Sequence, residues 1–171
     1  MRRMLLAVVM LLLSLPGLSG AATLHGMVRQ VYDGDTLLLV VRPQGQLKVR
    51  LYGIDAPETA KPDRQGQAYS AVAKRVLMYK LLGKAVTVEV RDQDRYGRTV
   101  GVVRLAGADI NAAMVAEGLA WAYRHHLEGD YASEYLRLED RARRRRLGLW
   151  RQPDPQPPWE FRRSSQGGRR R

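Results

Sequence analysis

Two acidic motifs are the first candidates for chemistry in this sequence. Residues 33–36 read Asp-Gly-Asp-Thr, and residues 55–58 read Asp-Ala-Pro-Glu. Hard divalent cations prefer oxygen ligands, and carboxylates at the ends of strands can supply them with little rearrangement. A zinc site has little support, because the chain has three His and no Cys. Taken singly, the first motif also fits a hairpin turn and the second a solvated loop.

Two arginines close to these motifs extend the chemistry towards phosphate. Arg50 lies in a stretch where Leu47, Val49 and Leu51 alternate with polar residues, so its side chain should point away from the core. Arg98 follows a Tyr-Gly turn. A guanidinium group can bind two phosphate oxygens at once, which an ammonium group cannot. Carboxylates, a cation and arginines together suit the cleavage of an anionic phosphodiester.

The charge of the chain is strongly basic. The formal net charge is +12 over 171 residues. Such an excess favours polyanionic partners through steering and counterion release. Charge alone leaves open a protein that only binds acidic surfaces.

The elements expected around the motifs are short. Alternating or β-branched runs bounded by Gly and Pro predict strands over 23–32, 36–41, 47–51, 86–90 and 99–105. Apolar residues at helical spacing predict three helices over 67–82, 110–118 and 131–147, the second of them capped by Asp109. This order predicts an α+β domain built on a five-stranded OB-fold β-barrel.

Three segments divide the chain. Residues 1–22 have a basic start, a short apolar run and small residues, as in a cleaved secretory signal peptide, with an uncleaved anchor as the alternative. Residues 23–150 form the expected domain. Residues 151–171 are rich in Pro and Arg and are expected to be partly disordered, although Trp159 and Phe161 could dock on the barrel. We therefore expect an exported monomer, periplasmic or secreted, with no membrane span after cleavage.

The motifs taken in order resemble a known family. The pattern consists of residues 33–36, 50–58 and 94–98, followed by 110–111, 118–123 and 148–150. It is similar to the staphylococcal nuclease (thermonuclease) family over about residues 23–150. The resemblance implies a calcium-dependent nuclease that hydrolyses DNA, RNA or both and leaves 3′-phosphate ends.

The resemblance also implies a metal site. It assigns Ca²⁺ to the carboxylates of Asp35 and Asp55 and to the backbone carbonyl of Ala56. Family members often carry Thr where Ala56 stands, but a backbone ligand does not depend on the side chain. Asp33 is expected to form the turn rather than to bind the metal directly.

Catalysis is assigned in the same way to three residues. The family pattern makes Glu58 the general base for the attacking water, with Arg50 and Arg98 on the phosphate. General-base help contributes on the order of a hundredfold or more, and a well-placed charged donor roughly 3 kcal/mol.

Substrate contacts are implied at three further positions. Arg95 and Tyr96 match positions that contact nucleotide phosphate in the family, and Tyr123 lies near its base-stacking tyrosines. Stacking on aromatic rings gives binding that tolerates many sequences.

Two other function classes are alternatives to a nuclease. A non-catalytic module that binds nucleic acid or peptides would be expected to have lost acidic or arginine positions, and none is lost here. An adhesion or envelope protein has only the basic charge and the predicted signal in its favour.

Overall fold

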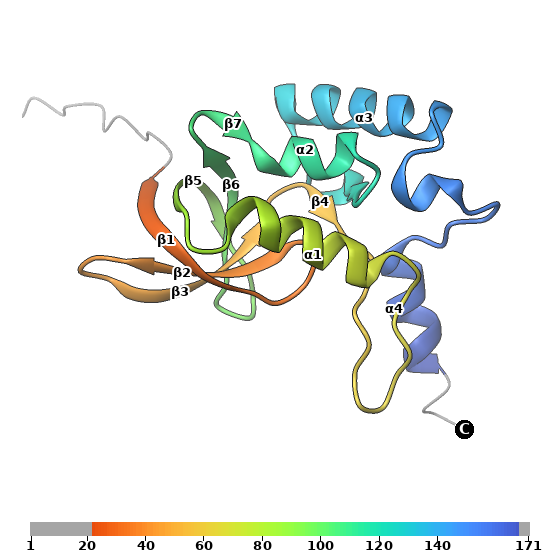
Figure 1. Ribbon diagram of the computed structural model, residues 1–171, viewed down its shortest axis with the longest axis horizontal. Helices are drawn as coiled ribbons and strands as arrows, with labels where there is room; N and C mark the ends of the chain where they lie inside the picture. Colours follow the sequence, from red (N-terminus) through yellow and green to blue (C-terminus); the bar gives the residue numbers. More distant parts are fainter. Residues whose placement is uncertain (1–21, 168–171) are drawn as a thin grey trace, which may run out of the picture.

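The computed structural model describes residues 22–167. The predicted signal therefore lies outside the described residues, apart from its last position, and it remains a prediction. Figure 1 shows a barrel with helices on its surface. The strands are β1 (Thr23–Val31), β2 (Thr36–Val41), β3 (Gly45–Leu51), β4 (Ile54–Asp55), β5 (Ala85–Gln93), β6 (Thr99–Leu105), β7 (Ala108–Asp109) and β8 (Trp121–Ala122). The helices are α1 (Ser70–Leu81), α2 (Ile110–Ala116), α3 (Gly129–Arg144) and α4 (Pro158–Gly167), with short 3-10 helices η1 (Arg124–His126) and η2 (Gly148–Arg151).

Five strands close into the barrel. Their order is β3-β2-β1-β5-β6, and a parallel pairing of β3 with β6 joins the two ends, while the other neighbours are antiparallel. Closure removes the unpaired edges of the sheet. Short β7 extends β6, and β4 pairs separately with β8. The α+β class and the five-stranded barrel are thus confirmed.

The barrel core follows from the alternation in the strands. Val49 and Leu51 of β3 are buried on either side of half-buried Arg50, as the period-two pattern predicts. Helix α1 covers the barrel with buried Ala73, Leu77 and Leu81 at spacings of four residues.

Helices α2 and α3 pack together, and α2 contacts β6 of the barrel (Figure 1). Asp109 caps α2 as predicted, because its carboxylate accepts a hydrogen bond from the Ala112 N–H at 2.8 Å. Residues 22–167 contain four α-helices where the sequence predicts three. The additional one is α4, in the segment expected to be an irregular tail. Within residues 22–167, no helix has the length and hydropathy needed to span a membrane.

Asn111 is a buried polar link between α2 and the barrel. Its Oδ1 accepts a hydrogen bond from the Val103 N–H at 3.0 Å, and its Nδ2 donates to the carbonyls of Tyr52 and Gly101 at 3.0 and 3.1 Å. All three partners are backbone groups at or beside the β3 and β6 strands. One side chain therefore satisfies three backbone groups that water does not reach.

A second apolar cluster lies beyond the barrel. It joins β8, α3 and η2 through Trp121, Ala142, Leu149 and Trp150, and Trp159 of α4 packs against it. Gly118 and Gly148 allow close approach of η2 to the end of α2. A Cβ on Gly148 would lie 2.1 Å from the Gly118 carbonyl oxygen, and a hydrogen bond from the Leu149 N–H to that oxygen fixes the contact at 2.8 Å.

An ion pair on the barrel surface predicts a pH dependence of stability. Glu89 accepts hydrogen bonds from Arg104 and from the Tyr131 hydroxyl, the latter at 2.8 Å. The hydrogen bond from Arg104 lowers the pKa of Glu89. The ion pair therefore contributes to the free energy of unfolding above the pKa of Glu89 in the unfolded chain, about 4.3. This contribution is lost as the pH falls through the lower pKa of Glu89 in the folded protein.

We therefore expect Glu89→Gln to lower the free energy of unfolding near pH 7 by no more than about 1 kcal/mol, because the pair is partly exposed. The difference from the parent should shrink below pH 4. Urea unfolding at pH 7 and pH 3 measures it, with Asp92→Asn, an exposed carboxylate of the same strand, as control. A difference that is the same at both pH values would contradict this expectation.

Candidate active site

The two acidic motifs meet at the end of the β2–β3 hairpin. Thr36 pairs with Arg50 in the antiparallel ladder, and the Leu51 N–H donates to the Asp35 carbonyl at 2.8 Å. Strand β4 follows β3 after a tight turn and places Asp55 beside the same hairpin. The barrel thereby brings together two carboxylates separated by twenty residues of chain.

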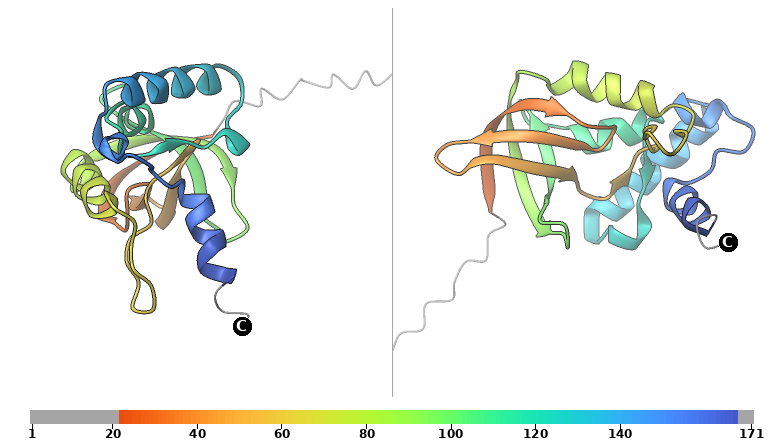
Figure 2. Two further views of the ribbon diagram at one scale, coloured as in Figure 1. Left: turned by 90° about the vertical axis from the view of Figure 1, so that its right-hand side faces the viewer. Right: turned by 90° about the horizontal axis from the view of Figure 1, so that it is seen from below.

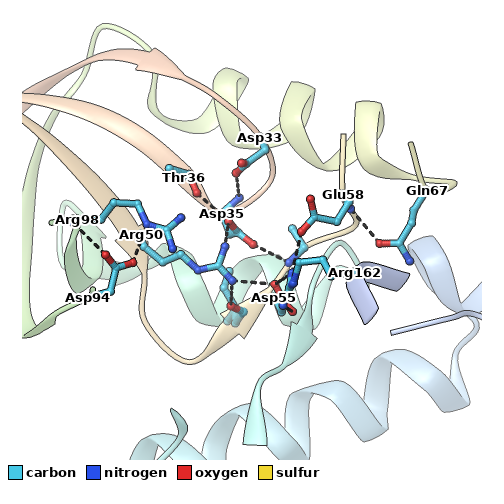
Figure 3. Close-up of polar contacts among 12 residues, drawn as sticks. Asp33, Asp35, Thr36, Arg50, Asp55, Glu58, Gln67, Asp94, Arg98 and Arg162 are labelled. Atoms are coloured by element: carbon cyan, nitrogen blue, oxygen red, sulfur yellow. Dashed lines mark hydrogen bonds and ion pairs between the residues drawn. The ribbon is translucent and has the colours of Figure 1, made fainter. Parts of the chain in front are cut away.

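Arg50 bridges the two carboxylates. It donates to Oδ1 of Asp35 through Nη1 and to Oδ1 of Asp55 through Nη2, the latter at 2.7 Å (Figure 3). Asp35 and Asp55 are 2% and 0% exposed, so their charges depend on such partners rather than on water. Burial alone would lower the pKa of Arg50, but the two carboxylates raise it above its usual value. Arg50 is therefore a permanent cation of the site.

Local hydrogen bonds orient Asp35. Its Oδ2 accepts from the Ala56 N–H at 2.7 Å, and its Oδ1 accepts from the Thr36 hydroxyl at 2.9 Å. Its own N–H donates to Asp33 Oδ1 at 3.0 Å, which confirms Asp33 as the residue that forms the turn. The bond to Ala56 links the two acidic motifs directly.

The absence of a side chain at Gly34 permits this arrangement. A Cβ there would lie 2.6 Å from the Ala56 Cβ and 2.8 Å from the Ala73 Cβ of α1. The turn therefore rests directly on Ala56 and on α1. A larger residue at position 34 would displace Asp35 from its partners.

The burial of neighbouring carboxylates at the site disfavours their charged forms. Burial, reinforced by the neighbouring carboxylate of Asp35, raises the pKa of Asp33 to about 7. Burial also raises the pKa of Asp55, and it outweighs the hydrogen bonds from Arg162 that act in the opposite direction. A cluster of this kind is stabilised by any additional cation.

Glu58 lies at the mouth of the cluster, on the loop between β4 and α1. Its N–H donates to Gln67 Oε1 at 3.0 Å, and the Gln67 N–H donates back to the Glu58 carbonyl at 2.9 Å. Its carboxylate is 19% exposed and accepts hydrogen bonds from Arg64 at 3.3 Å and from Arg162 at 2.7 Å. Both carboxylate oxygens thus contact guanidinium groups.

Arg162 of α4 is the second cation at the buried carboxylates. Its Nη1 and Nη2 donate to Oδ1 and Oδ2 of Asp55 at 3.1 and 2.8 Å, and Nη1 also reaches Glu58 (Figure 3). This is a bidentate pair with Asp55, the strongest form of such a contact.

The remaining predicted arginines lie on the β5–β6 hairpin. Thr99 pairs with Val49 of β3, so Arg98 lies beside the strand that carries Arg50. Its guanidinium donates to Asp94 at 2.7 Å rather than to the buried carboxylates. Arg95 donates to the hydroxyl of Tyr96 at 2.8 Å, and Tyr96 is 69% exposed. The structure thus places these side chains near the site but not in direct contact with its acids.

Tyr123 lies on the other flank of the site. It directly follows β8, which pairs with β4, and its N–H donates to the Gly53 carbonyl at 2.8 Å. Its ring is stacked on Trp159 of α4, with the centroids 5.3 Å apart and the planes at 23°. The predicted base-stacking side chain is thus covered by an indole ring from the chain itself.

Comparison with known proteins decides the family. Residues 48–152 match the protein family described as "Staphylococcal nuclease homologue". The chain belongs to the staphylococcal nuclease family. Among similar proteins, the "Micrococcal nuclease" of Shigella flexneri is 40% identical over 172 residues, which cover 95% of this chain and 92% of that protein. "Protein ParB" of Escherichia coli is 42% identical over 158 residues, with 86% and 84% covered. An "Uncharacterized endonuclease" of Escherichia coli is 36% identical over 142 residues, with 82% and 86% covered.

Membership of the staphylococcal nuclease family confirms the enzyme class, a nuclease and therefore a hydrolase. It also confirms the predicted resemblance.

The site of this staphylococcal nuclease homologue also contains residues that the sequence does not single out. They are Arg64, Gln67 and Arg162, which surround Glu58. Arg162 is one of several arginines in a tail that has no periodic pattern. Its position depends on contacts with Asp55 and Glu58, which lie more than a hundred residues earlier in the chain. The nearest signal in the sequence is the adjacent pair of aromatic residues, Trp159 and Phe161, which suggested docking of the tail.

Proposed function

We propose that the protein is a calcium-dependent nuclease that hydrolyses phosphodiester bonds of DNA or RNA and leaves 3′-phosphate ends. The convergence of Asp35 and Asp55 on Arg50, with Glu58 linked to Asp55 through Arg162, carries this proposal. It combines buried oxygen ligands with a general base and a fixed cation. The net charge of +12 supports a polyanionic substrate.

The donor set fits a divalent cation. Within residues 22–167, no group of three or more His, Asp or Glu side chains is arranged as a metal site. Two carboxylates and a backbone carbonyl, from Asp35, Asp55 and Ala56, form the candidate set, and all their atoms are hard oxygens. Arg50 forms ion pairs with Asp35 and Asp55, and Arg162 forms one with Asp55. These pairs support the binding of positive charge at the two carboxylates. Bound calcium would screen the negative charge of the phosphodiester against the attacking water.

The side chains of this chain would perform the remaining steps. Glu58 would take a proton from the attacking water, since it lies at the exposed side of the cluster. Arg50 would donate hydrogen bonds to phosphate oxygens as charge develops on them. Arg98 would supply a second guanidinium group from the β5–β6 hairpin. It would bind phosphate in place of its ion pair with Asp94.

The direct test is cleavage by the purified full chain. Single-stranded DNA and RNA are incubated with calcium at increasing concentration and then with chelator, and the product ends are identified. We expect cleavage that rises with calcium, stops with chelator and leaves 3′-phosphates. Cleavage that continues in chelator would refute calcium dependence. Binding without cleavage at any calcium concentration would instead favour the non-catalytic module.

The role of Glu58 makes a separate prediction. Glu58→Gln keeps the size of the side chain but removes the base, so we expect the rate of cleavage to fall by about a hundredfold or more. Initial rates at saturating calcium measure the effect. Glu134→Gln, at an exposed position on α3, is the matched control and should retain the parental rate. Equal rates for the two variants would remove Glu58 from the mechanism.

A further inference from the structure

Helix α4 covers the candidate active site with two side chains of different chemistry. Figures 1 and 2 show α4 and the loop between β4 and α1 extending from the same side of the barrel. From this helix, Arg162 reaches Asp55 and Glu58, while Trp159 reaches Tyr123 and Trp121. The proposed function assigns Asp55 to the metal and Glu58 to catalysis, and the family resemblance assigns Tyr123 to the substrate.

The guanidinium group of Arg162 binds one of the carboxylates that the proposed function gives to a cation. It occupies both carboxylate oxygens of Asp55, a proposed ligand, with hydrogen bonds of 2.8 and 3.1 Å. It also donates to Glu58 Oε1 at 2.7 Å, while Arg64 donates to Oε2. Both carboxylate oxygens of Glu58 therefore already have guanidinium partners.

The indole of Trp159 stands at the position of a nucleic-acid base. Its ring lies nearly parallel to that of Tyr123, with 5.3 Å between the centroids, and contacts Trp121 edge-on at 5.6 Å. Parallel stacking on an aromatic side chain is the geometry by which single-stranded nucleic acids are held. A base cannot stack on the same face of Tyr123 while Trp159 is there.

The segment that carries these side chains can leave without unfolding the barrel. It follows η2 through a linker of residues 152–157, which contains Pro153, Pro155 and Pro157. Besides the contacts at the site, Trp159 packs on the second apolar cluster and Pro158 is buried. A hydrogen bond of 2.9 Å from Gln67 to the Gln156 carbonyl and the stacking of Arg64 on Phe161 add to these. None of these contacts is with the barrel strands β1 to β3, β5 or β6. Ten residues form a helix that is marginal on its own in water.

A pocket of about 170 Å³, partly open to solvent, lies between this segment and the domain. It is lined among others by Pro57, Gln67, Trp121, Pro155, Gln156 and Phe161. Solvent therefore reaches part of the boundary along which α4 is docked.

We propose that α4 is an autoinhibitory plug: Arg162 occupies the carboxylate of Asp55, a proposed calcium ligand, and Trp159 occupies a face of the Tyr123 ring, so calcium and substrate must displace α4 before the site acts. The inference rests on the proposed function. The open form would bind calcium with its intrinsic affinity, and the observed affinity would be reduced by the fraction of molecules that are open.

Calcium titration of matched variants tests the plug. We expect Arg162→Ala to bind calcium about tenfold or more tightly than the parent in isothermal titration calorimetry. Arg163→Ala, which removes the same charge from an exposed neighbour on α4, should bind as the parent does. Trp159→Ala keeps every charge but weakens docking, and it should raise the calcium affinity several-fold.

Two outcomes would overturn the plug while leaving the nuclease intact. One is an unchanged calcium affinity in Trp159→Ala. The tighter binding in Arg162→Ala would then come only from the removal of a positive charge next to Asp55. The other is unchanged amide hydrogen exchange in residues 158–165 of the parent at saturating calcium, since displacement of α4 must expose those amides. Absence of calcium binding in every variant would instead refute the calcium site, and the plug with it.

Discussion

Replacement of Arg50 by lysine is expected to lower the rate constant for cleavage by about a hundredfold or more. Arg50 presents two N–H groups to two carboxylates, Asp35 in the turn before β2 and Asp55 on β4, and the same fork would meet phosphate oxygens in the transition state. Lysine keeps the charge but offers a single point donor on a flexible stem. Loss of one preorganised donor of this kind costs roughly 3 kcal/mol in the transition state.

Steady-state kinetics on single-stranded DNA at saturating calcium measure the effect of Arg50→Lys, alongside thermal unfolding. Arg104→Lys is the matched control, because Arg104 is also a strand arginine in an ion pair but lies at Glu89 on the barrel surface. We expect a lower kcat for Arg50→Lys alone. A parental kcat would show that Arg50 only balances the charge of Asp35 and Asp55.

Replacement of Asn111 by alanine is expected to cause the largest loss of stability among the substitutions considered. It leaves the Val103 N–H and the carbonyls of Tyr52 and Gly101 without their partner in a fully buried place. Each unsatisfied buried group costs about 1–3 kcal/mol, so the free energy of unfolding should fall by about 3 kcal/mol or more.

Urea unfolding followed by circular dichroism measures the loss for Asn111→Ala. Gln46→Ala, at an exposed position of β3, serves as control and should change stability by less than about 0.5 kcal/mol. A loss below about 1 kcal/mol for Asn111→Ala would mean that water reaches the three backbone groups.

The sequence predicts the barrel well because its signals are local. The alternation around Val49 and Leu51, and the cap at Asp109, depend on neighbours in the chain, and the structure confirms both. The meeting of Asp35 with Asp55 follows from strand pairing together with the family resemblance. The bond from Ala56 to Asp35 and the support from Gly34 could not be read from spacing, since they depend on how two turns pack.

The C-terminal segment could not be predicted in the same way. Its proline and arginine content is typical of an irregular tail, yet residues 158–167 form α4. The position of Arg162 at Asp55 depends on aromatic contacts of Trp159 with β8 and on the path of the linker. Such contacts join distant parts of the chain and leave no periodic pattern.

The contact between Gly118 and Gly148 has a further consequence. Because η2 is fixed to the end of α2 at this point, the linker to α4 always starts from the same place on the domain. Helix α4 and the active site that it covers therefore belong to one molecule. The local concentration of α4 at the site depends on the length of the linker. Dilution of the protein would not relieve the closure, and two copies of the chain would not be required for it.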